Sequence, residues 1–307
     1  MPLSILLKRI SYNFFLNFLF YIIFKILNNY FNKNNYNYYL VNIMQKVINA
    51  HCHIYPDKIA SKAVEGIKDF YDLNMSLNGK TDDLIKDGNN VGVVHYLIHS
   101  VATSPKQVKS INEFISYEVG QHPDLFTGFG TLHPDSDDIQ GDFDYLIELG
   151  LKGVKLHPDF QLFALNEKRA FDLGEVINAG EVPLLIHCGD FRYNYSNPEQ
   201  LIPFLDKFPE MTVIGAHFAG WSMWEDATRQ LAGRENLYVD LSSSLYALSP
   251  ETAKELIHAY GADKVLWGTD YPMWEAVSEM EYFNKIDLTD EERSMILYEN
   301  SAKLLKL

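Results

Sequence analysis

The stretch NAHCHIYP, residues 49–56, follows the short apolar run Val47–Ile48. A strand that ends in a His-x-His pair directs both imidazoles to one side, because alternate side chains of a strand share a face. Both rings could then reach one ion, since a zinc–imidazole bond is about 2.1 Å long. Two hydrogen-bonded histidines without a metal would show the same pattern, so other residues must decide between the two readings.

The same stretch bears on the fold. An open doubly wound sheet usually shows a glycine-rich phosphate turn after its first strand, and NAHCHIYP stands in that place instead. Strand-like runs alternate with helical stretches along the rest of the chain, and several runs are short and apolar, as expected for strands covered on both faces. The runs are residues 46–53, 92–101, 125–133, 153–157, 183–188, 212–217, 237–242 and 265–270.

Amphipathic segments separate these runs. A last helix is expected from about residue 289 to 305, where Thr289 and Glu292 have the spacing of a capping box. Eight strand–helix units in about 250 residues have the size and rhythm of a (β/α)8 barrel. The sequence therefore predicts an α/β protein, a single-domain TIM barrel with a C-terminal helix. The other helices are expected at residues 106–121, 143–149, 167–179, 198–208, 224–231 and 250–260.

Charge and cysteine content narrow the class of protein. The 307 residues carry a net charge of −15, which argues against nucleic acid or an anionic membrane surface as the main partner and leaves a small-molecule substrate as the expected one. The chain has two cysteines, Cys52 and Cys188, which form no CxxC pair and no disulfide framework. A reducing cytoplasm is therefore the simpler location.

The first 43 residues differ from the rest. They hold no acidic residue and four basic ones, and they are crowded with Phe, Tyr, Ile and Asn. Residues 10–27 are mostly apolar but contain two asparagines and a lysine, so they are a marginal match for a membrane span. We interpret residues 1–43 as a non-native or disordered apolar extension, and residues 44–307 as the barrel. A signal anchor, which would attach the protein to a membrane, and an ordered extension are the alternatives.

Most of the histidines lie where a TIM barrel has its active site. Seven of the ten lie at or near the carboxyl ends of the expected strands, which form the mouth of such a barrel. Asp270 ends the eighth expected strand, and a metal or a histidine would satisfy a buried carboxylate there. On correctly ordered strands, this constellation predicts a metal site. The seven histidines are His51, His53, His99, His133, His157, His187 and His217.

The motifs resemble those of the amidohydrolase superfamily. They are most similar to the amidohydrolase-2 branch, which includes aminocarboxymuconate-semialdehyde decarboxylase and related carboxy-lyases. The resemblance runs from about residue 46 to the C-terminus, and it is specific to the branch but not to a substrate. It rests on NAHCHIYP, GVKLHP, LLIHCG, VIGAHFAG, LWGTDYP and the closing ENSAKLL.

The resemblance implies one divalent ion, usually Zn²⁺, and barrels of this branch are often homodimers. His51 and His53 would bind the ion from strand one, together with His187 and Asp270, and an open position would take water or substrate. His217 would stay off the metal and polarise the substrate or move a proton. Asp270 would also act in catalysis.

Three further residues have open roles. In binuclear members of the superfamily, a carboxylated lysine stands at the position of Lys155, and His187 and His217 would then hold a second metal. His157 shares a face with Lys155, so either side chain could be the one that reaches the mouth. Arg192, in the loop after the fifth strand, could clamp a substrate carboxylate with its planar fork, or it could be a surface arginine.

The expected activity is metal-dependent hydrolysis of a C–O or C–N bond in a small organic substrate by an activated water. Asp270 would accept the proton of the water, and His217 would steady the oxyanion. The alternative is non-oxidative decarboxylation of a small carboxylic acid at the same metal site. A third hypothesis is that the protein is not an enzyme. It would then be a metal-binding protein without catalysis or a membrane-anchored scaffold.

Overall fold

The strands of this protein are short and almost entirely buried, as their apolar runs predict. The structure, a computed structural model, describes residues 46–307, so the interpretation of residues 1–43 concerns a segment outside the described residues. Residues 46–307 form one compact unit. Its strands are β1 (Val47–His53), β2 (Val93–His99), β3 (Phe126–Gly128), β4 (Gly130–Thr131), β5 (Val154–Leu156), β6 (Leu184–Ile186), β7 (Val213–Gly215), β8 (Leu237–Asp240) and β9 (Val265–Leu266).

These strands close into a barrel. All neighbouring pairs are parallel, in the orders β1-β2-β3 and β4 through β9. β3 and β4 are two halves of one barrel strand interrupted at Phe129, whose N–H donates to the Ile98 carbonyl at 3.0 Å. The last strand joins the first through the N–H of Ala50, which donates to the Trp267 carbonyl at 2.9 Å. The predicted (β/α)8 barrel is therefore confirmed.

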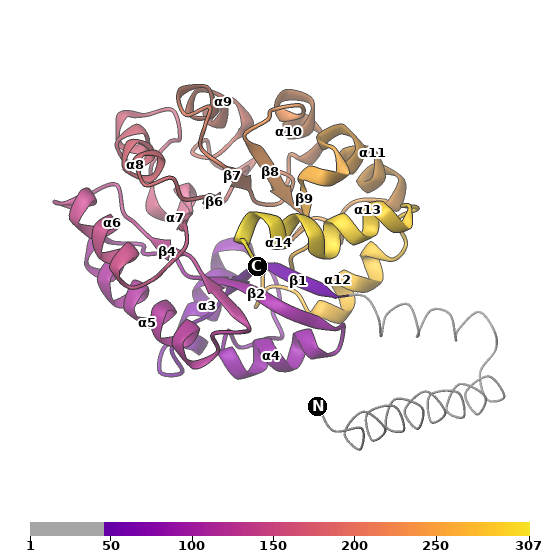
Figure 1. The fold of residues 1–307 in the computed structure, drawn as a ribbon. Coiled ribbons are helices and arrows are strands. Elements are labelled where there is room, and N and C mark those ends of the chain that lie inside the picture. The colour runs from indigo at the N-terminus through magenta and orange to yellow at the C-terminus, as the bar shows by residue number, and fades with distance from the viewer. Residues whose placement is uncertain (1–45) are drawn as a thin grey trace, which may run out of the picture. The chain divides into compact units, whose positions relative to one another are not determined.

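A ring of helices surrounds the strands (Figure 1). The predicted helices are all present, with small shifts at their ends. α3, α4, α7 and α12 were not expected from the sequence, although the apolar residues of α3 recur on one face as they do in the predicted helices. The helices are α3 (Ala60–Tyr71), α4 (Thr81–Asn89), α5 (Val108–Gln121), α6 (Ile139–Glu148), α7 (Pro158–Gln161), α8 (Lys168–Ala179), α9 (Pro198–Lys207), α10 (Trp224–Leu231), α11 (Pro250–Tyr260), α12 (Ala276–Phe283), α13 (Asp290–Ser294) and α14 (Asn300–Leu305).

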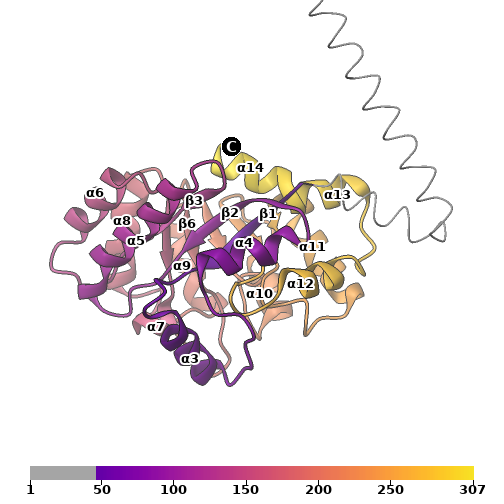
Figure 2. The same ribbon diagram turned by 90° about the horizontal axis from the view of Figure 1, so that it is seen from below.

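The two ends of the barrel are covered by different elements. α13, a π-helical turn (Met295–Glu299) and α14 run continuously, and the predicted capping box of Thr289 and Glu292 begins them. Leu304 and Leu305 pack against the barrel interior. Figure 2 shows α14 at one end and α3 with α7 at the opposite end. The mouth, where the strands end, is therefore bordered by α3 and α7.

Side chains fill the barrel interior, as they do in other barrels of this type. The largest of them, Phe129, is fully buried, and its ring lies so close to Gly153 that a Cβ built there would come within 2.6 Å of it. Both cysteines are free and buried. Among residues 46–307, no helix has the length and apolar character needed to cross a membrane. The interior layer consists of Ala50, Leu97, Phe129, Leu185, Ile214, Ala216 and Leu266.

We expect Phe129→Ala to lower the free energy of unfolding by about 3–5 kcal/mol, because it leaves a cavity in a close-packed layer. Tyr117→Ala on α5, where the side chain is 60% exposed, is the control and should change it by about 0.5 kcal/mol or less. Urea denaturation followed by circular dichroism measures both. Equal losses for the two variants would contradict this packing.

Candidate active site

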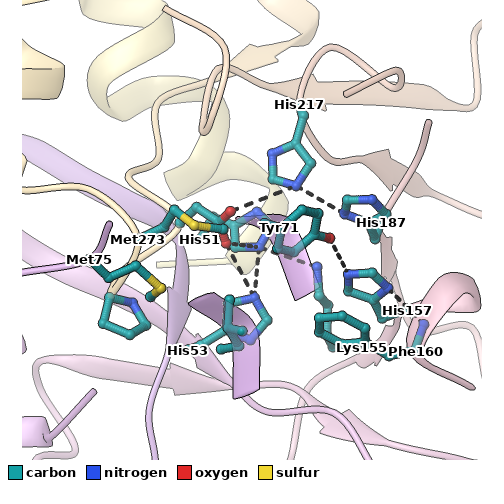
Figure 3. Close-up of a pocket in the computed structure, with 13 residues that line it drawn as sticks. His51, His53, Tyr71, Met75, Lys155, His157, Phe160, His187, His217 and Met273 are labelled. Carbon is teal, nitrogen blue, oxygen red and sulfur yellow. Dashed lines mark hydrogen bonds and ion pairs between the residues drawn. The ribbon is translucent and has the colours of Figure 1, made fainter. Parts of the chain in front are cut away.

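A pocket opens at the carboxyl ends of the strands, where the sequence analysis placed the chemistry. Strand ends supply its histidines, Lys155 and Asp270, while α3 and α7 supply much of its apolar wall (Figure 3). The pocket is lined by His51, His53, Ile67, Tyr71, Met75, Lys155, His157, Phe160, His187, His217, Asp270, Pro272 and Met273.

Three of the four predicted metal ligands converge closely. His51 Nε2 lies 3.2 Å from His53 Nε2 and 3.2 Å from Asp270 Oδ1, and His53 Nε2 lies 3.3 Å from the same carboxylate oxygen. Ligand atoms at about 2.1 Å from a tetrahedral ion stand about 3.4 Å apart. The spacing of this triad therefore fits three corners of such a site.

A buried carboxylate sets the tautomer of His51. Its Nδ1 lies 2.9 Å from Asp240 Oδ2, and a carboxylate can only accept a hydrogen bond there. The Nδ1 atom therefore carries the proton, and Nε2 presents a lone pair to the pocket. Burial lowers the pKa of His51 to about 4, so the ring is neutral at pH 7. A carboxylate behind a metal-binding histidine commonly orients it in this way.

His187 and His217 are held by carbonyl oxygens. His187 Nε2 lies 3.2 Å from the Gly189 carbonyl, and His217 Nδ1 lies 2.8 Å from the Ser242 carbonyl. Since a carbonyl accepts, each of these nitrogens carries the proton, and the other nitrogen of each ring is a lone pair. Those two lone-pair atoms, His187 Nδ1 and His217 Nε2, face each other at 3.1 Å. Two lone pairs at this distance repel unless a cation or a proton lies between them.

The donor set therefore fits a divalent metal ion. Three imidazoles turn lone pairs inward, and the Asp270 carboxylate adds an anionic oxygen. His187, the fourth predicted ligand, stands beside His217 rather than within the triad, and His217 Nε2 is 3.9 Å from Asp270 Oδ2. These side chains are candidates to hold the ion.

Two site residues adopt a backbone conformation that side chains usually avoid. His217 has φ +60° and Asp270 has φ +55°, both in the left-handed region. Hydrogen bonds hold them, because the His217 N–H donates to Asp240 Oδ1 at 3.2 Å and the Ser243 hydroxyl donates to Asp270 Oδ2 at 2.6 Å. Such conformations cost free energy and occur often at functional sites.

Lys155 and His157 both reach the mouth. Lys155 is fully buried with Nζ 3.2 Å from His51 Nε2, and burial lowers its pKa to about 8. His157 lies flat between His187 and Phe160, with ring centroids 3.9 and 3.8 Å apart. Both nitrogens of His157 are engaged, one with the Phe160 N–H and one with the Tyr71 hydroxyl. His157 therefore has no free lone pair to offer a second ion.

Arg192 does not line the pocket. Its Nε and Nη2 donate to the two carboxylate oxygens of buried Asp190 at 2.9 and 2.7 Å, and its Nη1 donates to the Phe70 carbonyl at 2.7 Å. The guanidinium also lies over the rings of Tyr71 and Trp221. The structure thus places Arg192 as a clamp on the end of α3.

The other rim histidines have different surroundings. His99 packs edge-on against the rings of His51 and His53, and His133 Nδ1 accepts from the Asp135 N–H at 3.1 Å. The sequence analysis missed Asp240 and Tyr71. A signal for Asp240 existed, since it lies near the end of an expected strand in LYVDLS, as Asp270 does in another expected strand, whereas no local pattern distinguishes Tyr71.

Asp240→Asn should weaken metal binding by about 10- to 100-fold, because an amide no longer fixes the His51 proton on Nδ1. Competition with a chromogenic chelator measures the affinity. Asp206→Asn, an exposed change outside the pocket, is the control and should leave the affinity unaltered. Unchanged affinity in Asp240→Asn would mean that His51 does not need this partner.

Solved structures share the fold. An uncharacterised TIM-barrel protein from Bordetella bronchiseptica is 18% identical, with a TM-score of 0.73 over 85% of this chain and 98% of that one. A dihydroxybenzoic acid decarboxylase from Polaromonas, with bound manganese and the inhibitor 2-nitroresorcinol, is 17% identical, with a TM-score of 0.66 over 86% and 98%. A probable 2-pyrone-4,6-dicarboxylic acid hydrolase from Acinetobacter baumannii, with citric acid bound, is 18% identical, with a TM-score of 0.62 over 85% and 99%.

At these identities the likeness shows the fold alone. No curated protein gives a significant match to this chain. The family model described as "Amidohydrolase" matches residues 48–307, which spans the whole barrel with its pocket. The resemblance drawn from the motifs is therefore confirmed, and this chain belongs to that amidohydrolase family.

Proposed function

We propose that this protein is a metal-dependent hydrolase that cleaves a C–O or C–N bond of a small organic substrate with an activated water. One observation carries the proposal: the imidazole lone pairs of His51, His187 and His217 turn toward one pocket that also holds the Asp270 carboxylate. The similar solved structures include a 2,6-dihydroxybenzoate decarboxylase and a probable hydrolase, so the reaction class has to be argued from the pocket.

An imidazole-rich set with one carboxylate suits Zn²⁺. We assign His51, His53, His187 and Asp270 as its ligands. When bound, the ion supplies Lewis-acid polarisation of a carbonyl and makes a water nucleophilic near neutral pH. The residues of the chain supply the proton transfers.

Hydrolysis needs a group that takes a proton from water and one that returns it to the leaving group. We assign these roles to Asp270 and His217, and the 3.9 Å between Asp270 Oδ2 and His217 Nε2 supports the assignment. Neutral His217 has no N–H directed into the pocket, because its proton is bonded to the Ser242 carbonyl. It can therefore take up a proton at Nε2 and then donate it, and it can stabilise an oxyanion only in that protonated form.

Decarboxylation is the second candidate, favoured by the apolar part of the wall. Ile67, Met75, Phe160 and Met273 line the pocket together with the histidines. Apolar surroundings disfavour a localised carboxylate charge, and loss of CO2 disperses that charge. The Polaromonas relative acts in this class, which keeps it open for this chain.

The test is to incubate the metal-loaded protein with panels of lactones, amides and aromatic carboxylic acids. We expect a new carboxylate to appear from a lactone or an amide. Release of CO2 from an aromatic acid would instead establish the second candidate. A metal-loaded protein that turns over none of these classes would favour the binding protein without catalysis.

His217→Asn should keep the metal and lower turnover by about 10²- to 10⁴-fold, because the asparagine can still donate to the Ser242 carbonyl but has no nitrogen at the Nε2 position. Metal content by mass spectrometry and turnover of the substrate found above are the two measurements. His258→Asn on α11, whose side chain is 46% exposed, is the matched control. Survival of full turnover in His217→Asn would remove the role given to this residue.

We also propose that the site holds one ion. Five side chains offer donor atoms in the pocket: His51, His53, His187, His217 and Asp270. An ion that binds four of them and one water uses most of the set, and His157 has no lone pair left for another ion. An unmodified Lys155 adds a cation beside His51 rather than the anionic bridge that two ions would need.

We therefore expect one metal per chain after loading and removal of excess ion, measured by inductively coupled plasma mass spectrometry. Dialysis against a strong chelator should remove the metal and the turnover together. Two ions per chain, with the mass of a CO2 adduct on a peptide that contains Lys155, would contradict the single-ion proposal.

A further inference from the structure

Tyr71 reaches the pocket from a helix outside the barrel. Tyr71 ends α3, is 9% exposed and lines the pocket (Figure 3). Its ring packs edge-on against Trp221, with centroids 4.9 Å apart, and Arg192 clamps the preceding residue through the Phe70 carbonyl. The ring is therefore held on the wall, with its hydroxyl 3.0 Å from His157 Nε2.

The direction of that hydrogen bond follows from the other nitrogen of His157. Its Nδ1 accepts the Phe160 backbone N–H at 3.3 Å, where His157 caps α7. An N–H can only donate, so Nδ1 carries no proton. A neutral imidazole has one N–H, which must then lie on Nε2. The Nε2–H therefore donates to the Tyr71 oxygen, and the hydroxyl hydrogen of Tyr71 is not used in this bond.

That hydroxyl hydrogen has no acceptor within residues 46–307. The bond to His157 is the one hydrogen bond of this hydroxyl among the described residues, and burial keeps the phenol protonated by raising the pKa of Tyr71 well above its usual value. The Tyr71 ring centroid lies 6.3 Å from that of His187, so the donor stands beside the proposed metal ligands. A buried donor without an acceptor is costly, and an oxygen of a bound molecule would remove that cost.

We propose that Tyr71 donates a hydrogen bond to a substrate oxygen, and that His157 is the positioning residue that keeps the phenol turned to do so. This inference rests on the proposed function only for the class of ligand, a small molecule with a carboxylate or carbonyl oxygen. Carboxylates are products of the hydrolysis and substrates of the decarboxylation, so the donor serves either reaction. The phenol selects for an acceptor oxygen at this wall, which Ile67 and Met75 cannot do.

The first measurement needs no ligand. Nitrogen-15 NMR of histidine-labelled full-length protein, assigned with His157→Asn, reports which ring nitrogen carries the proton. We expect His157 to be the Nε2–H tautomer. An Nδ1–H tautomer would overturn the inference, because the Tyr71 hydroxyl would then donate to His157 and have nothing to offer a ligand.

The second measurement uses benzoate as the probe on the metal-loaded protein. Tyr71→Phe should weaken benzoate binding by about 10- to 100-fold, the loss expected for one hydrogen bond to a charged group. The infrared carboxylate stretch of carboxyl-labelled [13C]benzoate should shift to higher frequency in the same variant. Tyr193→Phe is the matched control, because Tyr193 also contacts Arg192 but does not line the pocket, and it should change neither value.

Equal affinity and an unchanged stretch in Tyr71→Phe would overturn the inference. Metal content and circular dichroism confirm that each variant is folded. The outcome is separable from that of the proposed function. A protein that turns over no ester, amide or acid but shows the Tyr71 effect on benzoate would refute the function alone, and an active enzyme without the effect would refute the donor alone.

Discussion

The candidate site depends on how each imidazole is held by the nitrogen that faces away from the pocket. Asp240 and the carbonyls of Gly189 and Ser242 accept from the remote nitrogens of three histidines. Because a neutral imidazole has one proton, each of these bonds determines that the opposite nitrogen is a lone pair. The inward convergence of lone pairs is thus a consequence of hydrogen bonds made behind the rings. The barrel matters because it brings these acceptors, from distant parts of the chain, to one rim.

The fold was predictable because its signals are local. Parallel strands buried on both faces appear as short apolar runs, and these runs mark all eight barrel strands, including the one interrupted at Phe129. The strand-borne site residues were predictable for the same reason, since the carboxyl end of a barrel strand has a known place in the fold. That position predicts that His51, His53 and Asp270 lie close together. In the structure, the Nε2 atoms of the two histidines and Asp270 Oδ1 lie within 3.3 Å of one another.

Other features of the site could not be predicted from the sequence, because they depend on contacts between distant segments. Asp240 ends a strand, but nothing in LYVDLS says that it bonds His51 rather than solvent. α3 is amphipathic, but its sequence does not say that its last residue, Tyr71, turns into the pocket at the carboxyl ends of the strands. Arg192 has the chemistry of a carboxylate clamp, yet buried Asp190 and the Phe70 carbonyl occupy its donors, which spacing cannot reveal. The tautomer of His157 depends on a backbone N–H and a tyrosine from different segments.

The clamp of Arg192 on the end of α3 has a consequence for how the pocket wall can vary. The proposed metal ligands lie at the strand ends, whereas Ile67 and Tyr71 reach the pocket from a helix anchored at Phe70. A substitution at Ile67 can therefore change the apolar wall while leaving the side chains at the strand ends unchanged. The wall that α3 contributes and the residues at the strand ends stand in separate stretches of the sequence, so the shape of the pocket can vary while its polar donor set stays the same.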